Sequence, residues 1–446
     1  MTIVTHLLPF SDEADTRTLR IGPNELHIDD VHVYDEIYSQ KYRFLKAPVS
    51  YAGFNAPYTA FTEIMPAAHK VRRKMIHPFF SKQGIVAVQP LLYNKVNLMM
   101  EKIRAFEGKE AVHLYGAVRC LTIDIISEFS FGQSFDTLEN IKDHSFRPEL
   151  LSVFDLVSEG QINFHYFPIL RAISRWTPVS LISALSKKMG IFQQLHKVLN
   201  SAKSSFDIAQ AEGKKFERLP LFDPLSSLSP EDLLAEAQDI IFAGSDTTAT
   251  SLGYLLNSVL SNPSILQHLR AELDANLPDK CEDWPLLKLE NLPYLTACVK
   301  ETLRCALPVP GRLPRVVPSN GPGAPAFAVG GKVIPPGSIV GLSATTMHYN
   351  EEIWGSDSKI FRPERWLGSD SKHLDKFLAT FGKGGRQCLG INLAYAELRI
   401  ATAKLFRCLE MDLDKSMTKR DLNQLDCFTS SFEGTGVRAF IRGERE

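Results

Sequence analysis

One cysteine follows a glycine-rich segment, FGKGGRQCLG at residues 381–390. A helical pattern begins directly after it, so Cys388 is predicted at a helix N-terminus, where free N–H groups and the helix dipole favour a thiolate. Gly384 and Gly390 would let the backbone approach a flat ligand closely, and Arg386 could bind an anionic group on that ligand. A lone cysteine can equally be a buried, inert residue, and this motif alone supports both interpretations.

A second candidate is the polar segment AGSDTT at residues 243–248, which interrupts an apolar helical pattern. Gly244 costs about 1 kcal/mol relative to alanine inside a helix, so we expect it to serve a specific purpose. The Thr247 hydroxyl can donate to the carbonyl oxygen four residues earlier and bend the helix. The expected result is a groove suited to a small ligand such as O2; the alternative is a solvent-facing polar turn.

The helix that carries this segment must be long. Residues 229–232, Ser-Pro-Glu-Asp, offer an N-cap, a proline at the first helical position and an acid in the first turn. Apolar periodicity runs over 233–260, and Asn262–Pro263 ends it. About 30 residues span roughly 45 Å. Such a helix favours one large domain, residues 1–446, which is mainly α-helical with small β-sheets.

The other predicted elements are short strands and one further helix. Extended segments are expected at Thr18–Ile21 and Glu25–Ile28, and at Phe327–Val329 and Lys332–Ile334 within a region rich in glycine and proline. Residues 389–407 have the apolar spacing and the strong helix formers of a helix.

The composition excludes several classes of protein. The chain has 446 residues, with 44% hydrophobic and 23% charged residues, which excludes intrinsic disorder. Its 50 basic residues balance 51 acidic ones, so nothing indicates a nucleic-acid partner. Seven irregularly spaced cysteines form neither a disulfide framework nor a zinc pattern, which favours a reducing compartment.

The glycine-rich segment resembles the haem-binding signature of the cytochrome P450 superfamily, F-x-x-G-x-R-x-C-x-G. The match covers Phe381, Gly384, Arg386, Cys388 and Gly390. The resemblance implies a mainly α fold with small β-sheets and the cofactor haem b, iron protoporphyrin IX. It also implies that Cys388 is the axial thiolate ligand of the iron, which favours O–O cleavage.

The long helix matches the same family. The resemblance assigns Asp246 and Thr247 as an acid–alcohol pair that delivers protons during oxygen activation. It also places Ala243 and Gly244 among the residues that bind the cofactor.

Two further segments match the family, ETLR at residues 301–304 and FRPERW at residues 361–366. The resemblance joins Glu301, Arg304 and Arg365 in a buried charge network beneath the haem. A buried triad of this kind adds little net stability but is costly to break. We therefore expect a structural role for these residues.

Basic residues should surround the two haem propionates. His69 and Arg73 lie four residues apart and share one helix face, and relatives use this spacing to hold a propionate. Arg315 matches another propionate-binding position. The intervening Lys70, Arg72 and Lys74 are expected on the solvated face, where cations could steer an acidic electron donor.

The resemblance implies a monooxygenase that inserts one oxygen atom into a hydrophobic small molecule. Electrons would come from NADPH through NADPH–cytochrome P450 reductase, with cytochrome b5 as a second candidate donor. The rival interpretations are a haem-thiolate isomerase or dehydratase of the same fold and an inactive truncated haem protein. The intact Asp246–Thr247 pair disfavours the isomerase.

Three segments, 19–28, 69–85 and 124–135, resemble filamentous-fungal enzymes of secondary metabolism such as trichodiene oxygenases, which oxidise terpenoid mycotoxin precursors. Membrane-bound members begin with an anchor and work on the cytoplasmic face of the endoplasmic reticulum. This sequence has no run of 18 apolar residues and opens almost at the first expected strand, so a cytoplasmic location is the alternative.

The substrate pocket is expected to draw on residues 50–66, Phe242, Ala243, Val309–Leu313 and Phe428–Phe432. The apolar stretch Ile162–Leu185 falls where relatives have a loop that touches the membrane. Ordinary core helices are an equally good interpretation of that stretch.

Overall fold

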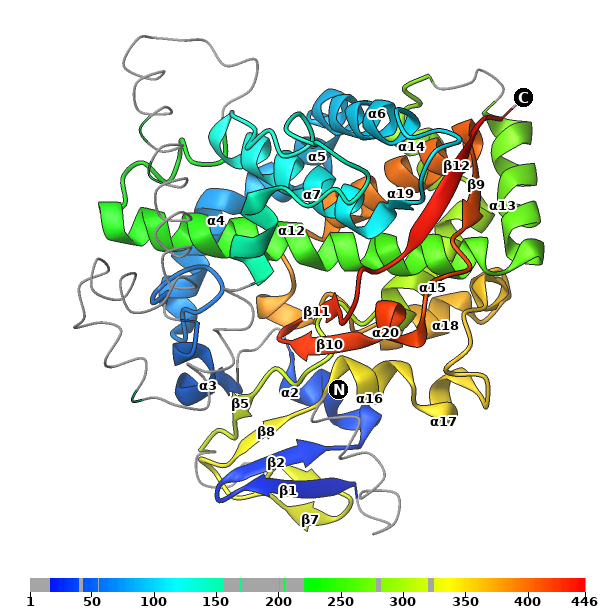
Figure 1. The fold of residues 1–446 in the computed structure, drawn as a ribbon. Coiled ribbons are helices and arrows are strands. Elements are labelled where there is room, and N and C mark those ends of the chain that lie inside the picture. Colours follow the sequence, from blue (N-terminus) through cyan, green and yellow to red (C-terminus); the bar gives the residue numbers. More distant parts are fainter. Residues whose placement is uncertain are drawn as a thin grey trace.

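The computed structural model describes residues 17–39, 43–54, 56–155, 220–277, 282–319 and 325–445, together with Ile169, Asn200 and Ser204. The stretch Ile162–Leu185 therefore lies outside the described residues, apart from Ile169. The described part is mainly α-helical with small β-sheets, as the sequence predicts (Figure 1).

Long helices make up the main body. They are α4 (Pro66–Phe80), α6 (Gln89–Arg104), α7 (Leu114–Phe131), α12 (Pro230–Leu260), α13 (Pro263–Asn276), α15 (Pro293–Cys305) and α19 (Ile391–Cys408). Shorter helices are α2 (Tyr34–Ile37), α3 (Pro48–Ala52), α5 (Lys82–Val86), α14 (Leu286–Glu290), α16 (Ala344–His348), α17 (Glu351–Trp354), α18 (Ser371–Leu374) and α20 (Lys419–Leu422).

Helix α12 crosses the whole width of the molecule, with α7 beside it (Figure 1). Its N-terminus is capped as predicted, because the Ser229 side chain accepts a hydrogen bond of 3.1 Å from the Asp232 N–H group. Gly244 allows α7 to approach closely, since a Cβ there would lie 2.5 Å from Cγ1 of Ile126. The specific purpose expected for Gly244 is therefore close packing of α12 against α7.

The strands form four small sheets. Strands β1 (Thr18–Gly22), β2 (Glu25–Ile28), β8 (Ile339–Gly341), β5 (Arg315–Val316) and β3 (Leu45–Lys46) form a five-stranded sheet in the order β1-β2-β8-β5-β3. The other sheets pair β6 (Ala328–Val329) with β7 (Lys332–Val333), β10 (Gln424–Cys427) with β11 (Thr429–Phe432), and β4 (Val112–His113) and β9 (Leu409–Leu413) with β12 (Arg438–Glu444). All four predicted strands are present, within two residues of the expected bounds.

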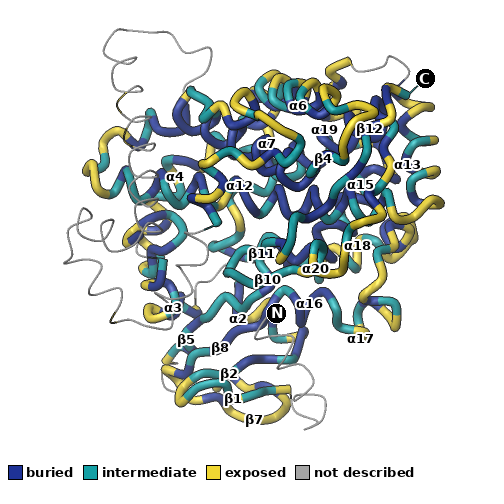
Figure 2. Tube along the Cα trace, viewed as in Figure 1, coloured by how far each residue is buried: buried dark blue, intermediate teal, exposed yellow. Residues whose placement is uncertain are grey.

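The apolar core follows the long helices. The largest buried cluster gathers side chains from α6, α7, α12, α15 and α19, and a second one packs beneath the five-stranded sheet (Figure 2). Among the described residues, no helix combines the length and the apolar character that a membrane span requires.

Helix α19 begins at Ile391 with Gly390 as its N-cap, not at Leu389 as predicted. Cys388 therefore lies three residues before the first residue of the helix instead of directly before it. The last turn before it is a 3-10 helix at Gly384–Arg386.

Candidate functional site

The segment around Cys388 is a closed loop. The Cys388 N–H group donates to the carbonyl oxygen of Phe381 at 2.8 Å, and the Gln387 N–H group donates to that of Gly384 at 3.1 Å. Within residues 381–390, Cys388 is exposed while every other residue is buried or half-buried. The loop thus presents one thiol and covers its own remaining side chains.

The surroundings of the thiol oppose its ionisation in the chain alone. Burial raises the pKa of Cys388, against the smaller lowering effects of the Gly390 N–H group and of Arg73. The N–H group at the start of α19 therefore favours the thiolate, as the sequence predicts, but burial outweighs it. A bound metal ion would reverse this balance, since a coordinated thiol loses its proton.

Two glycines of the loop, Gly384 and Gly390, have different surroundings. Gly384 has φ +72°, and a Cβ there would lie 2.2 Å from the carbonyl oxygen of Tyr38. Its close approach is thus to the chain's own backbone and not to a flat ligand, as expected from the sequence. At Gly390 a Cβ would meet only Sγ of Cys388, at 4.0 Å, so space beside the thiol stays open.

Five basic side chains lie near this loop: Lys46, His69, Arg73, Arg315 and Arg386. Lys46 and Arg315 are directly opposite each other on β3 and β5. Burial, followed by Arg315 and Arg386, lowers the pKa of Lys46 well below its ordinary value. Burial and three of the cations, Arg386, Lys46 and Arg73, lower the pKa of His69 to about 3. The His69 ring is therefore uncharged at neutral pH, and the arginines supply the positive charge of the site.

Backbone carbonyl groups orient these cations. Arg386 donates to the carbonyl oxygens of Glu63 and Ile64, the latter at 2.7 Å, and thereby braces the segment before α4. Arg73 of α4 donates to the Gln387 carbonyl oxygen at 2.7 Å. These contacts hold α4 against the cysteine loop from both sides.

Arg315 is 4% exposed and donates to the Tyr51 hydroxyl at 2.7 Å. Its guanidinium also lies over the ring of Tyr38, 5.1 Å from the centroid. The four basic residues that the sequence assigns to propionates thus gather in one place.

This arrangement fits the iron porphyrin that the resemblance implies. Carboxylates would relieve the mutual repulsion of the cations, and a metal ion would stabilise the Cys388 thiolate. The cations and the Cys388 thiol, which would bind these two groups, lie on neighbouring parts of one site.

Helix α12 presents a different surface at residues 243–248. Ala243 is exposed although the flanking turns are buried, and Thr247 is half-buried. The Thr247 hydroxyl donates to the Ala243 carbonyl oxygen at 2.8 Å, as predicted. Residues four apart share a helix face, so the alcohol and the exposed alanine lie on the same side of α12.

Asp246 lies elsewhere. It is 6% exposed, and its Oδ1 accepts a hydrogen bond of 2.9 Å from Nε of Arg119 on α7. Arg119 also forms an ion pair of 2.7 Å with Asp155, whose side chain is 31% exposed. Asp246 thus connects to the surface through Arg119 and Asp155.

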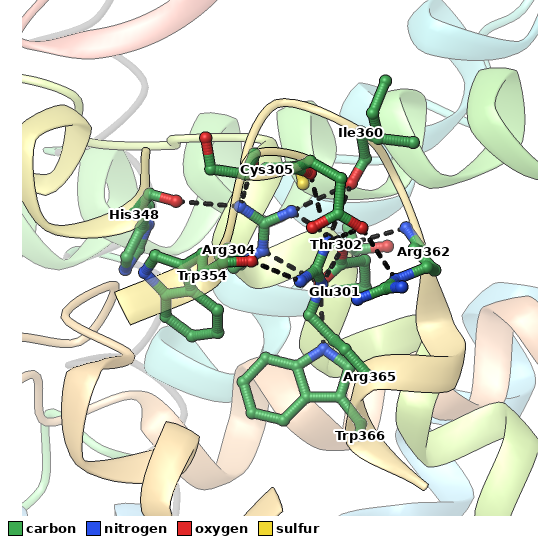
Figure 3. A network of polar contacts seen from close by, with 12 residues as sticks. Glu301, Thr302, Arg304, Cys305, His348, Trp354, Ile360, Arg362, Arg365 and Trp366 are labelled. Carbon is green, nitrogen blue, oxygen red and sulfur yellow. Dashed lines mark hydrogen bonds and ion pairs between the residues drawn. The ribbon is translucent and has the colours of Figure 1, made fainter. Parts of the chain in front are cut away.

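Glu301 stands at the centre of a buried polar network (Figure 3). Its carboxylate accepts hydrogen bonds from Nε and Nη2 of Arg304 at 2.9 and 2.7 Å, and from Nε of Arg365 at 3.0 Å. The Trp366 indole and the Arg362 backbone N–H group also donate to it, each at 2.9 Å. The three residues that the sequence groups together are in direct contact.

The network extends to the cysteine loop. Nη1 of Arg304 donates to the His348 carbonyl oxygen at 2.8 Å, and the His348 ring accepts from the Ala379 N–H group at 2.8 Å. Burial lowers the pKa of His348 to about 3, so the ring stays neutral and can accept. The Thr380 hydroxyl donates to the Leu303 carbonyl oxygen at 2.7 Å. The start of the loop is therefore fixed to α15.

Aromatic rings line part of the expected pocket. Phe54, Phe61 and Phe428 pack edge to face, with centroids 4.6 to 5.7 Å apart, and Tyr51 joins them at 5.6 Å from Phe61. Segments 50–66 and 428–432 thus meet as predicted. Phe242 instead packs against Phe154, 4.8 Å away.

The surface of α4 differs from the expectation at one position. Lys70 and Lys74 are exposed, as predicted for a solvated basic face. The side chain of Arg72 is only 12% exposed and pairs with Glu236 at 3.7 Å and Asp232 at 3.9 Å. Arg72 therefore belongs to the contact between α4 and α12.

Sequence reasoning missed Lys46, Arg119 and His348. Arg119 carries a readable signal, because it is a single cation within the apolar helix LYGAVRCLTIDIISEFSF and so needs a buried partner. Lys46 and His348 acquire their contacts only from strand pairing and from the packing of distant loops.

Comparison with known proteins gives a consistent result. A sequence model of the family "Cytochrome P450" matches residues 27–431. The cytochrome P450 monooxygenase macH of Penicillium terrestre is 32% identical over 93% of this chain and 82% of its own length. Cytochrome P450 monooxygenase tpcC of Cochliobolus heterostrophus is 33% identical over 93% and 79%. N-acetyltryptophan 6-hydroxylase ivoC of Emericella nidulans is 31% identical over 95% and 83%.

Replacing Glu301 by alanine tests the central network. Two buried guanidinium groups would lose their carboxylate, so Glu301→Ala should lower the free energy of unfolding by about 3–5 kcal/mol. Glu444→Ala is the matched control, because it removes an exposed pair with Arg104 at 2.6 Å that contributes about 0–1 kcal/mol. Urea unfolding measures both, and equal losses would contradict the assignment.

Proposed function

The chain belongs to the cytochrome P450 family and is a monooxygenase of that family, and we propose that it inserts one oxygen atom of O2 into a hydrophobic secondary-metabolite intermediate. The observation that carries this proposal is the exposed thiol of Cys388 beside a buried basic cluster. That combination suits a metal ion held in an anionic ring.

The residues of this chain would hold haem b as follows. Cys388 would bind the iron, and Arg73, Arg315, Arg386 and His69 would meet the two propionates, with Lys46 as a further cation. Bound in this way, the haem supplies the redox centre at which O2 is activated. The cations are already oriented by backbone carbonyl groups, so little rearrangement is needed for binding.

Thr247 is the group on α12 that we assign to proton delivery. Its hydroxyl is fixed by the Ala243 carbonyl oxygen and its oxygen can hold a water molecule on the exposed side of the helix. Asp246 could replenish the protons that Thr247 delivers only after its ion pair with Arg119 breaks. Protons would then come from solvent by way of Asp155, which is partly exposed. A positioned proton donor of this type contributes about 10²–10⁴-fold to a rate.

The substrate would be apolar or aromatic, since rings of Phe54, Phe61 and Phe428 gather beside the proposed site. A relative named for hydroxylating N-acetyltryptophan acts on an aromatic compound, which supports this class. Terpenoid intermediates are a second class that the sequence resemblance suggests.

Electrons would come from NADPH through a cytochrome P450 reductase, or from cytochrome b5. The exposed Lys70 and Lys74 on α4 offer positive charge to an acidic partner. The enzyme would meet the reductase at the cytoplasmic face of the endoplasmic reticulum, in peripheral contact with the membrane.

Cys388→Ser tests the assignment of the iron ligand. A thiolate opposite carbon monoxide shifts the Soret band of the reduced complex strongly to the red, because it changes the electronic structure of the haem. We expect the variant to lose this band and Cys427→Ser to keep it. Retention of the band in Cys388→Ser, measured by absorption spectroscopy, would refute the proposal.

Thr247→Val tests the proton-delivery assignment. The variant should consume NADPH but release hydrogen peroxide instead of product, because the hydroxyl that positions a proton donor is gone. Thr247→Ser keeps the hydroxyl and should keep most of the coupling. The measurement is product formed per NADPH consumed. An isomerase would consume no O2 in any of these proteins, and unchanged coupling in Thr247→Val would remove this residue from the mechanism.

A further inference from the structure

Asp239 lies on the functional face of α12. It precedes Ala243 by four residues and Thr247 by eight, so the three share one side of the helix. At 1.5 Å per residue, Asp239 is about 6 Å from Ala243 and about 12 Å from Thr247 along the helix axis. Neither the haem assignment nor the proton-delivery assignment uses this carboxylate.

One oxygen of Asp239 is occupied by the loop that precedes α4. The Thr62 hydroxyl donates to the Ala56 carbonyl oxygen and lies 2.9 Å from the Thr59 hydroxyl. The Thr59 hydroxyl donates to Oδ2 of Asp239. Oδ1 of Asp239 has no hydrogen-bond or ion-pair partner among the residues that the structure describes.

The neighbouring charged side chains, Glu236 and Lys46, contact other groups. Both oxygens of Glu236 accept from the Ala60 N–H group, at 3.0 and 3.1 Å. Lys46 donates to the Phe61 carbonyl oxygen and lies over the Tyr51 and Phe61 rings, at 4.2 and 4.3 Å from their centroids. Burial, with Glu236, raises the pKa of Asp239 to about 7, against Thr59 and Lys46. Asp239 thus keeps one carboxylate oxygen, Oδ1, to which no described residue donates.

An apolar wall adjoins this acceptor. Phe61 belongs to the loop that carries Thr59, and its ring packs with those of Phe54 and Phe428. The site therefore combines aromatic surface with one polar group, an arrangement typical of small-molecule pockets in which few polar groups fix the orientation of the ligand.

We propose that Asp239 is a specificity-determining residue that accepts a hydrogen bond from a neutral hydroxyl or N–H group of an aromatic substrate. Its donor would lie about 6–12 Å along α12 from the carbon that is oxidised near Ala243 and Thr247. A neutral donor fits better than an ammonium group, because Lys46 and its neighbouring cations oppose further positive charge. This inference rests on the proposed function, which sets the position of the reacting carbon.

Calorimetry on the haem-loaded protein tests the proposal with two matched probes, biphenyl and 4-phenylphenol. The wild type should bind 4-phenylphenol about tenfold more tightly than biphenyl. Asp239→Ala should bring the two affinities together. In Asp239→Asn, Thr59 would donate to the amide oxygen and the NH2 group could donate to the phenol oxygen, so part of the preference should remain. Glu231→Gln removes an exposed acid from the same helix and should change nothing.

Three outcomes would overturn the proposal: equal affinities in the wild type, binding of neither probe, or a preference that persists in Asp239→Ala. The readout involves no turnover and no iron spectrum. Failure here would therefore leave the Cys388 spectrum intact, whereas failure of the proposed function would appear in that spectrum and not in this comparison.

Discussion

The concentration of positive charge beside Cys388 is the constraint on which the structure depends. Cations in a protein interior are costly, and here burial together with the neighbouring cations lowers the pKa of both Lys46 and His69. The fold tolerates the cluster because strands β3 and β5 hold Lys46 and Arg315, and backbone carbonyl groups accept hydrogen bonds from Arg73 and Arg386. The same bonds join α4 to the cysteine loop, so a site for carboxylates and a rigid support for the thiol arise together.

A second buried polar system supports the loop from α15. Glu301 accepts hydrogen bonds from five donors. Hydrogen bonds through Arg304, His348 and Ala379 extend this network to the residues before Phe381. Helix α12 completes the frame, because close packing at Gly244 fixes it against α7 while Ala243 and Thr247 remain accessible. The proposed site is thus supported by α4, α15 and α12, which come from distant parts of the chain.

Local signals in the sequence predicted what depends on local physics. The cap at Ser229 and the break at Asn262 gave the bounds of α12, and the i, i+3 spacing gave the contact of Glu301 with Arg304. The sequence did not reveal why Gly384 and Gly244 are needed, because each makes room for a segment far away in sequence. Arg72 and Asp246 likewise found buried partners on other helices, which no periodicity reveals.

The basic cluster beside Cys388 is proposed to bind the two carboxylates of a porphyrin. The most direct measurement is titration of the apoprotein with iron protoporphyrin IX and with its dimethyl ester, which has the same iron and ring but no charge on the propionates. Two charge-assisted contacts predict that the ester binds about 10²–10⁴-fold more weakly. Equal affinity for the two compounds would contradict the account.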